Sequence, residues 1–302
     1  MIERILVPLD GSDVAEQALP HAAALARTFD ATVLLSRVPE PLLVPVMSAG
    51  VWITRTVESE EAFEKALEYL DEVASRDVLG GLRVETRRPS YPVVHGLLNS
   101  IREDSVDLVV MTTHGHTGPD RWVFGSVADK LVQVAPVPVF VVRAKRDPEQ
   151  DVAIRRIVVP LDGSPLAERA LPAAEALAVS TGSSILLVRI PIVPGYLTVV
   201  PETAGWIPEQ LSESAVASEA YLAEQAVKLR ANGLQVDEEV QVVTGGTVAD
   251  GILAESKKYG ADVIVISSHG RSGIGRWIFG SVATRVLHGA ECAVWVVRED
   301  TK

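Results

Sequence analysis

Cysteine and aromatic residues are scarce in this chain, which has one cysteine among its 302 residues and 5% aromatic residues. A single cysteine excludes an intrachain disulfide framework and a zinc site built from several thiolates. We expect that residue, Cys292, to be a small core residue inside a strand. We also expect the protein to be cytoplasmic, because free thiols persist in a reducing compartment.

The chain also lacks an excess of positive charge and a long apolar run. Its 28 Lys and Arg against 40 Asp and Glu give a net charge of −12, which disfavours nucleic acid and anionic membranes as partners. No apolar stretch approaches the ~20 residues that a membrane-spanning helix needs. The first residues, MIERILVPLDGS, are charged within four positions, so they predict a strand and not a signal peptide.

An internal repeat is the strongest signal in the sequence. Residues 110–143 and 265–298 give the same succession of an apolar run, a loop with glycines and hydroxyls, Gly-Ser, a helical pattern and another apolar run. Gly125 and Gly280 are separated by 280 − 125 = 155 positions. The repeat and a polar linker at residues 144–153 divide the chain into two domains, residues 1–147 and 152–302.

The repeat offset differs at the start of the two copies. The Pro-Leu-Asp-Gly-Ser segments, at Pro8 and at Pro160, are separated by 160 − 8 = 152 positions. Three residues are therefore gained in the second copy between the first strand and the third helix. That stretch includes a long Pro-bearing segment, residues 39–56 and 191–207, which we expect to be irregular. Such segments are functional covers or packed surface loops, and the sequence favours neither.

In each half five apolar runs alternate with four helical stripes. This alternation predicts two tandem, doubly wound, parallel five-stranded α/β sheets. Ser12 and Ser164 are expected helix N-caps, and Pro165 is expected at the first helical position. Pro20 and Pro172 predict a kink or break of the first helix in both halves. For the long helix of the second half, residues 212–231, we expect one stripe of Ala220, Ala223, Ala226 and Val227, with Arg230 near its edge.

The loop after the fourth strand is the first candidate for chemistry. Gly115-x9-Gly125-Ser126 matches Gly270-x9-Gly280-Ser281, and Gly118 and Gly273 add a flexible point within each loop. Glycines let backbone N–H groups approach a phosphate, while Ser126 and Ser281 can cap a helix or donate to an anion. A tight strand-to-helix turn explains Gly-Ser alone, but two long loops of equal length favour phosphate binding. Neither a Walker A sequence nor the dinucleotide fingerprint is present.

Asp10 and Asp162 follow the first strands, at the edge where open α/β sheets bind ligands. Each carboxylate can accept from a base or a ribose, or it can close its own turn. His114 and His269 have no second ligand repeated at short spacing, so we expect no metal site. A shared hydrolytic base is not indicated either, because the loop acid Asp120 is replaced by Gly275.

Each half resembles a universal stress protein domain, through residues 7–12 and 159–164 and through the two Gly-rich loops. Nucleotide-binding members of that family have Gly-x2-Gly-x9-Gly-Ser/Thr after the fourth strand. Here Thr112 and Ser267 replace the first Gly, which adds a Cβ and a hydroxyl near the bound ribose. The resemblance implies a strand order of 3-2-1-4-5 and pairing of the two domains through their fifth strands, as an intramolecular pseudo-dimer open to further homodimerisation.

The resemblance also implies one ATP site per domain, with ATP bound alone or with Mg²⁺, in a regulatory stress-response protein that acts through an unknown protein partner. Asp10 and Asp162 would face the nucleoside, and the backbone at Val38 and Ile190 would meet the adenine edge. The alternatives are an interaction scaffold that binds no nucleotide and a slow ATP hydrolase. The expected nucleotide-binding residues are Pro8, Asp10, Val38, Thr112, His114, Gly115, Gly118, Gly125, Ser126, Val127, Pro160, Asp162, Ile190, Ser267, His269, Gly270, Gly273, Gly280, Ser281 and Val282.

Overall fold

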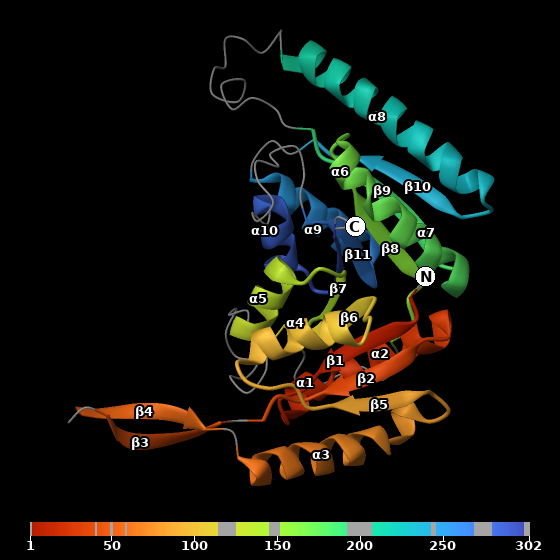
Figure 1. Cartoon of the computed structure of the whole chain (residues 1–302). Helices are drawn as coiled ribbons and strands as arrows, with labels where there is room; N and C mark the ends of the chain where they lie inside the picture. Colours follow the sequence, from red (N-terminus) through yellow and green to blue (C-terminus); the bar gives the residue numbers. More distant parts are fainter. Residues whose placement is uncertain are drawn as a thin grey trace. The chain divides into compact units, whose positions relative to one another are not determined.

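The structure is a computed structural model of the whole chain (Figure 1). It describes residues 2–39, 41–48, 51–57, 59–113, 125–144, 152–191, 207–242, 246–268 and 280–298. The chain divides into two compact units, Met1–Val152 and Ala153–Lys302. Among the described residues, no helix has the length and apolarity to cross a membrane.

Each unit contains five parallel strands in the predicted order 3-2-1-4-5. In the first unit the order is β5–β2–β1–β6–β7, with bounds Val84–Arg87, Thr32–Ser36, Arg4–Pro8, Leu108–Thr112 and Val139–Val142. In the second unit it is β10–β9–β8–β11–β12, with bounds Val236–Val240, Ser184–Arg189, Arg156–Pro160, Val263–Ser267 and Ala293–Val297. Strand order reverses beside β1 and β8, which places the ligand-binding edge of each sheet there.

Helices connect the strands as the alternating pattern predicts. The first unit has α1 Asp13–Glu16, α2 Ala18–Phe29, α3 Glu60–Ala74, a 3₁₀ turn at Asp77–Leu79, α4 Val93–Glu103 and α5 Ser126–Val134. The second unit has α6 Pro165–Glu168, α7 Ala170–Thr181, α8 Ile207–Ala231, α9 Val248–Tyr259 and α10 Ser281–Gly289. Cys292 lies one position before β12, not inside it, and burial raises the pKa of its thiol to about 12.

The predicted caps and breaks of the first helices are confirmed. The hydroxyls of Ser12 and Ser164 accept from backbone N–H groups three residues on, at 3.1 Å in both units. Pro165 is the first residue of α6. In each unit the helix is interrupted three residues before its proline, because Pro20 and Pro172 lack the N–H that would continue it.

The expectation of an irregular segment at residues 39–56 is wrong. This part of the first unit forms an antiparallel hairpin, β3 Leu42–Ser48 and β4 Val51–Val57, in a sheet of its own. The hairpin extends away from the main sheet (Figure 1), and Trp52 is 66% exposed. Pro45 suggested a loop, but a strand with a free edge accommodates proline. In the second unit, residues 192–206 lie outside the described part of the chain.

The predicted stripe of α8 is wrong in part, because Ala226 is buried but Ala220 and Val227 are exposed. Val227 is 63% exposed, and the apolar residues that the helix buries include Leu222, Ala226 and Leu229. Two polar residues share that buried face, Ser218 at 1% exposure and Gln225 at 5%. An apolar pattern could not identify this face, because it assigns serine and glutamine to the surface.

The three extra residues of the second unit lie after its third strand. The first residues of β5 and β10 are still 236 − 84 = 152 positions apart, whereas those of α4 and α9 are 248 − 93 = 155 apart. The gain therefore falls between β10 and α9, and not in the long segment that follows the second strand. The first residues of β1 and β8, and those of β2 and β9, are likewise 152 positions apart.

Candidate functional site

A tight turn follows the first strand of each unit. The Asp10 carboxylate accepts from the N–H and hydroxyl of Ser12, at 2.9 and 2.6 Å. In the second unit Asp162 accepts from the N–H of Ser164 at 2.8 Å. The glycine between each pair has a φ of +88° or +84°, which suits a residue without Cβ. Both aspartates thus close their turns.

The fourth strand of each unit ends beside the start of a nine-residue helix. Thr112 and Ser267, the last residues of β6 and β11, are buried at 4% and 8% exposure. The helix N-caps are Gly125 and Gly280, so the serines that follow them are the first helical residues and not the caps. Among the described residues no side chain caps either helix, so the first N–H groups of α5 and α10 can bind an anion.

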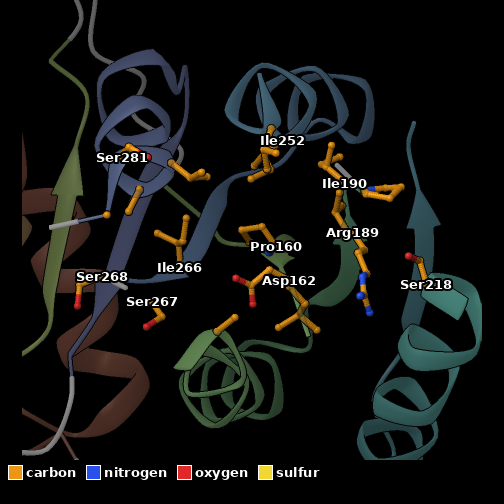
Figure 2. Close-up of a pocket in the computed structure, with 18 of the residues that line it drawn as sticks. Pro160, Asp162, Arg189, Ile190, Ser218, Ile252, Ile266, Ser267, Ser268 and Ser281 are labelled. Carbon is orange, nitrogen blue, oxygen red and sulfur yellow. The ribbon is translucent and has the colours of Figure 1, made fainter. Parts of the chain in front are cut away.

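These elements enclose a cavity of about 470 Å³ in the second unit (Figure 2). It opens at the carboxyl ends of β8, β9 and β11 and is bounded by α6, α8, α9 and α10. Ser267, Ser268 and Ser281 lie on one side of it, Asp162 and Pro160 in the middle, and Arg189 and Ser218 on the other side (Figure 2). The remaining lining residues are mostly apolar: Leu161, Ala167, Val188, Ile190, Pro191, Ser214, Val248, Ile252, Ile266, Gly280, Val282 and Ala283.

The structure brings the described site residues of the second half together. The cavity is lined by Pro160, Asp162, Ile190, Ser267, Gly280, Ser281 and Val282, whereas His269, Gly270 and Gly273 lie outside the described residues. In the first unit, Pro8, Asp10, Val38, Thr112, Gly125, Ser126 and Val127 occupy the matching positions of the sheet edge and of α5. His114, Gly115 and Gly118 lie outside the described part of the chain.

Sequence reasoning missed four polar residues of the cavity, Arg189, Ser214, Ser218 and Ser268. Arg189 had a usable signal, because Arg37 precedes Val38 at the same repeat offset, 189 − 37 = 152. The two serines of α8 had none, since the apolar pattern did not identify this part of the helix as a wall of the cavity. Alanines stand at their counterparts, residues 62 and 66.

A polar network connects the cavity wall to the first-strand turn. The guanidinium of Arg189 lies 4.7 Å from the ring centroid of Tyr221, whose hydroxyl donates to Glu168 at 2.8 Å. Burial and this hydrogen bond raise the pKa of the Tyr221 hydroxyl well above its ordinary value. A Cβ on Gly163 would meet the Arg189 guanidinium at 3.2 Å, so the glycine also makes room for the arginine.

The first unit has the same network with one addition. Arg37 lies over Tyr69, and the Tyr69 hydroxyl donates to Glu16 at 2.7 Å. Arg76 also forms an ion pair with Glu16. The counterpart of Arg76 is Lys228, which pairs instead with Glu224 at 2.9 Å. Glu16 of the first unit therefore has an ion-pair partner besides the tyrosine hydroxyl, from which Glu168 also accepts in the second unit.

Metal-binding potential can be judged only for the described residues. Within those ranges, no three His, Cys, Asp or Glu side chains gather as a cluster that could hold a metal ion. The polar groups around the second unit's cavity are a carboxylate, a guanidinium, several hydroxyls and a helix N-terminus. This set can bind an anion at one end and a hydrogen-bonding group at the other.

Comparison with known proteins gives a consistent result for both halves. A model of the universal stress protein family matches residues 1–143 and again residues 153–298. A universal stress protein from Mycolicibacterium smegmatis is 29% identical over 298 residues, which cover 97% of this chain and 96% of that protein. One from Methanocaldococcus jannaschii is 30% identical over 144 residues, which cover 47% of this chain and 83% of that protein.

Solved structures agree over the whole chain. The crystal structure of a universal stress protein from Archaeoglobus fulgidus has a TM-score of 0.67, at 21% identity and 98% coverage of both chains. A putative universal stress protein from Pseudomonas aeruginosa has a TM-score of 0.66, at 17% identity, covering 99% of this chain and 94% of that one. At such identities the likeness shows the fold alone.

Proposed function

The chain belongs to the universal stress protein family as a tandem member, and we propose that each of its domains, residues 1–147 and 152–302, binds one molecule of ATP. The role that we propose is regulatory. Bound nucleotide would bias the conformation of the chain and its choice of a protein partner, in the cytoplasm, without turnover as its purpose.

The observation that carries the proposal is the cavity of the second unit. Its volume of about 470 Å³ is within the range of about 300–1,000 Å³ that small-molecule sites occupy. It lies at the carboxyl ends of the strands where strand order reverses, the usual ligand position in open α/β sheets. Its lining is largely apolar with a few polar groups, as a site for a base and ribose requires.

The groups at the Ser281 side of the cavity fit a phosphate. Helix α10 begins there at a glycine N-cap, and the partial positive charge of a helix N-terminus attracts an anion. The Ser281 and Ser267 hydroxyls can donate to phosphate or ribose oxygens. Asp162 lies between this corner and the opposite wall (Figure 2), where its carboxylate can accept from ribose hydroxyls. Mg²⁺ bound with the nucleotide would take phosphate oxygens as ligands.

Calorimetry on paired glycine variants tests the proposal. Gly125→Val and Gly280→Val add a side chain at the start of α5 and of α10, where it would obstruct phosphate approach. We expect the double variant to lose ATP binding while circular dichroism shows an unchanged fold, and each single variant to lose one site. Mass spectrometry of gently purified wild-type protein should reveal retained adenine nucleotide. Unchanged ATP affinity in the double variant would contradict the proposal.

We also propose that the two domains pair through their last strands, β7 and β12, as an intramolecular pseudo-dimer. Both strands are short and apolar, and an unpaired apolar edge promotes aggregation. Hydrogen exchange tests this, because edge pairing protects the amides of both strands. Rapid exchange at both would count against the pairing. Size-exclusion chromatography with light scattering would show whether two chains associate further.

A further inference from the structure

Helix α8 forms one wall of the second unit's cavity through two serines that are one helical turn apart. Both Ser214 and Ser218 line the cavity. Ser218 lies on the buried face of α8, at 1% exposure. Figure 2 shows its side chain next to Arg189, across the cavity from Ser267 and Ser281. This wall is therefore at the end of the cavity away from the anion-binding start of α10.

The hydrogen bond of Ser218 determines what this wall can recognise. Its hydroxyl donates to the backbone carbonyl of Ser214 at 2.7 Å. A hydroxyl has one proton and two lone pairs. Because the Ser218 proton is used in the bond to Ser214, its Oγ can only accept a hydrogen bond from a group in the cavity. A partner on the ligand must then supply an N–H or O–H group.

Arg189 adds the opposite property at the same end. A guanidinium has only donors, and stacking over Tyr221 fixes its plane. Acceptor and donor thus lie on the same side of the cavity (Figure 2), which Ile190 and Ile252 also line with apolar surface. A flat heterocycle with an exocyclic amino group beside a ring nitrogen complements this pair.

We propose that Ser218 reads the amino group of the bound base, so that the second unit prefers an aminopurine to a purine without that group. This inference rests on the proposed nucleotide site and concerns its base end. Arg189 is the neighbouring donor, and Tyr221 positions it.

The first unit provides an internal comparison. Arg37 and Tyr69 repeat the arginine and its supporting ring, but the counterpart of Ser218 is Ala66, since 218 − 152 = 66. Ala66 is buried at 2% exposure on α3, so the change removes only the hydroxyl at an equivalent packed position. The first unit consequently lacks this acceptor, and its base preference should be weaker.

The test compares two nucleotides on two reciprocal variants of the full chain. Ser218→Ala is made with Gly125→Val, so that the second unit supplies the binding signal, and Ala66→Ser is made with Gly280→Val. Calorimetry measures the affinity for ATP and for purine riboside triphosphate, which lacks the amino group. We expect Ser218→Ala to weaken ATP about three- to ten-fold, the effect of one neutral hydrogen bond, and to leave purine riboside triphosphate unchanged. Ala66→Ser should increase the preference for ATP.

Three results would overturn the inference, and they differ from failure of the proposed function. Equal losses for both nucleotides would mean that Ser218 only shapes the wall, and no loss for either would mean that it does not contact the base. If Ser218→Ala alters the circular dichroism spectrum, the Ala66→Ser variant decides instead. An unchanged preference for ATP over purine riboside triphosphate in that variant would overturn the inference. If the wild-type chain binds neither nucleotide, the proposed function itself is wrong.

Discussion

The guanidinium of Arg189 lies over the ring of Tyr221, with 4.7 Å between Cζ and the ring centroid. Arg37 and Tyr69 have the same relation at 4.5 Å in the first unit. In both units the arginine follows the second strand or ends it, the tyrosine belongs to the next long helix, and a glutamate of the first helix accepts the tyrosine hydroxyl. Three elements around the ligand edge of each sheet are thereby connected.

The two tyrosine hydroxyls should contribute unequally to stability. Tyr221→Phe removes the hydrogen bond to Glu168, and we expect it to lower the free energy of unfolding of its unit by about 1 kcal/mol. Tyr69→Phe should cost less, because Glu16 keeps its ion pair with Arg76. Thermal denaturation of the two variants measures the difference. A larger loss for Tyr69→Phe would show that the arginine does not compensate.

The same tyrosines should resist ionisation. Burial and the nearby glutamates raise their pKa in the folded state. Their stabilising contribution is therefore complete below the pKa of unfolded tyrosine, about 10, and is lost as the pH rises toward the folded-state pKa. A phenolate absorbance titration of the Tyr69→Phe, Tyr221→Phe double variant should match the wild type up to about pH 10 and differ only above it. A difference near pH 10 would contradict the raised pKa.

Two substitutions at Asp162 should separate its turn from its ligand role. Asp162→Asn keeps an oxygen that can accept from Ser164, so the thermal stability should stay close to that of the wild type. Asp162→Ala removes that acceptor and should cost about 1 kcal/mol. If the carboxylate accepts from the ribose, both variants should weaken ATP binding by calorimetry. If Asp162→Asn binds ATP with the wild-type affinity, the role of Asp162 is to close the turn and not to bind the ribose.

The charges of the two Gly-rich loops predict unequal affinities. Between the His-Gly and Gly-Ser landmarks the second loop has Arg271 and Arg276, whereas in the first loop Asp120 offsets Arg121. An arginine well placed at a phosphate contributes about 1.5–3 kcal/mol, and an exposed one under about 1 kcal/mol. We expect tighter ATP binding by the second domain.

Salt provides the check on this asymmetry, since screening weakens charge-based binding. Calorimetry of ATP on full chains with Gly125→Val or Gly280→Val compares the two domains at low and high salt. The gap between them should shrink as salt rises. Tighter binding by the first domain, or a gap indifferent to salt, would show that the loop charges do not set the affinity.

The fold followed from the sequence where local chemistry and periodicity agree. Ser12 and Ser164 were identified as caps because a serine hydroxyl before a helical stripe can accept from the unpaired N–H groups of the first turn. The break before Pro20 follows from the N–H that proline lacks. The fourth strands themselves were identified because uninterrupted apolar runs are typical of buried strands, although Thr112 and Ser267, expected after them, are their last residues.

The rest depended on contacts that a pattern of apolar residues does not encode. The hairpin β3–β4 was missed because apolar residues such as Met47, Val51 and Trp52 are exposed in it, so neither burial periodicity nor polarity identified it. Ser218 was missed because its hydroxyl is satisfied by a backbone carbonyl, which lets a polar residue occupy a buried face. The positions of Gly125 and Gly280 as helix caps were likewise hidden by the serines that follow them.

The constant offset of 152 from β1 through β5 bears on how the two halves diverged. The strands β1, β2 and β5 begin 152 positions before β8, β9 and β10, so residues of the two halves correspond by number across this part, although α3 has 15 residues and α8 has 25. Ala66 and Ser218 therefore occupy corresponding positions, and a substitution at either one gives that domain the side chain of the other. Exchange of residues 4–87 with 156–239 would preserve the chain length and the spacing of the sheet strands, which makes this pair of domains suited to recombination of the walls that we propose to bind the base.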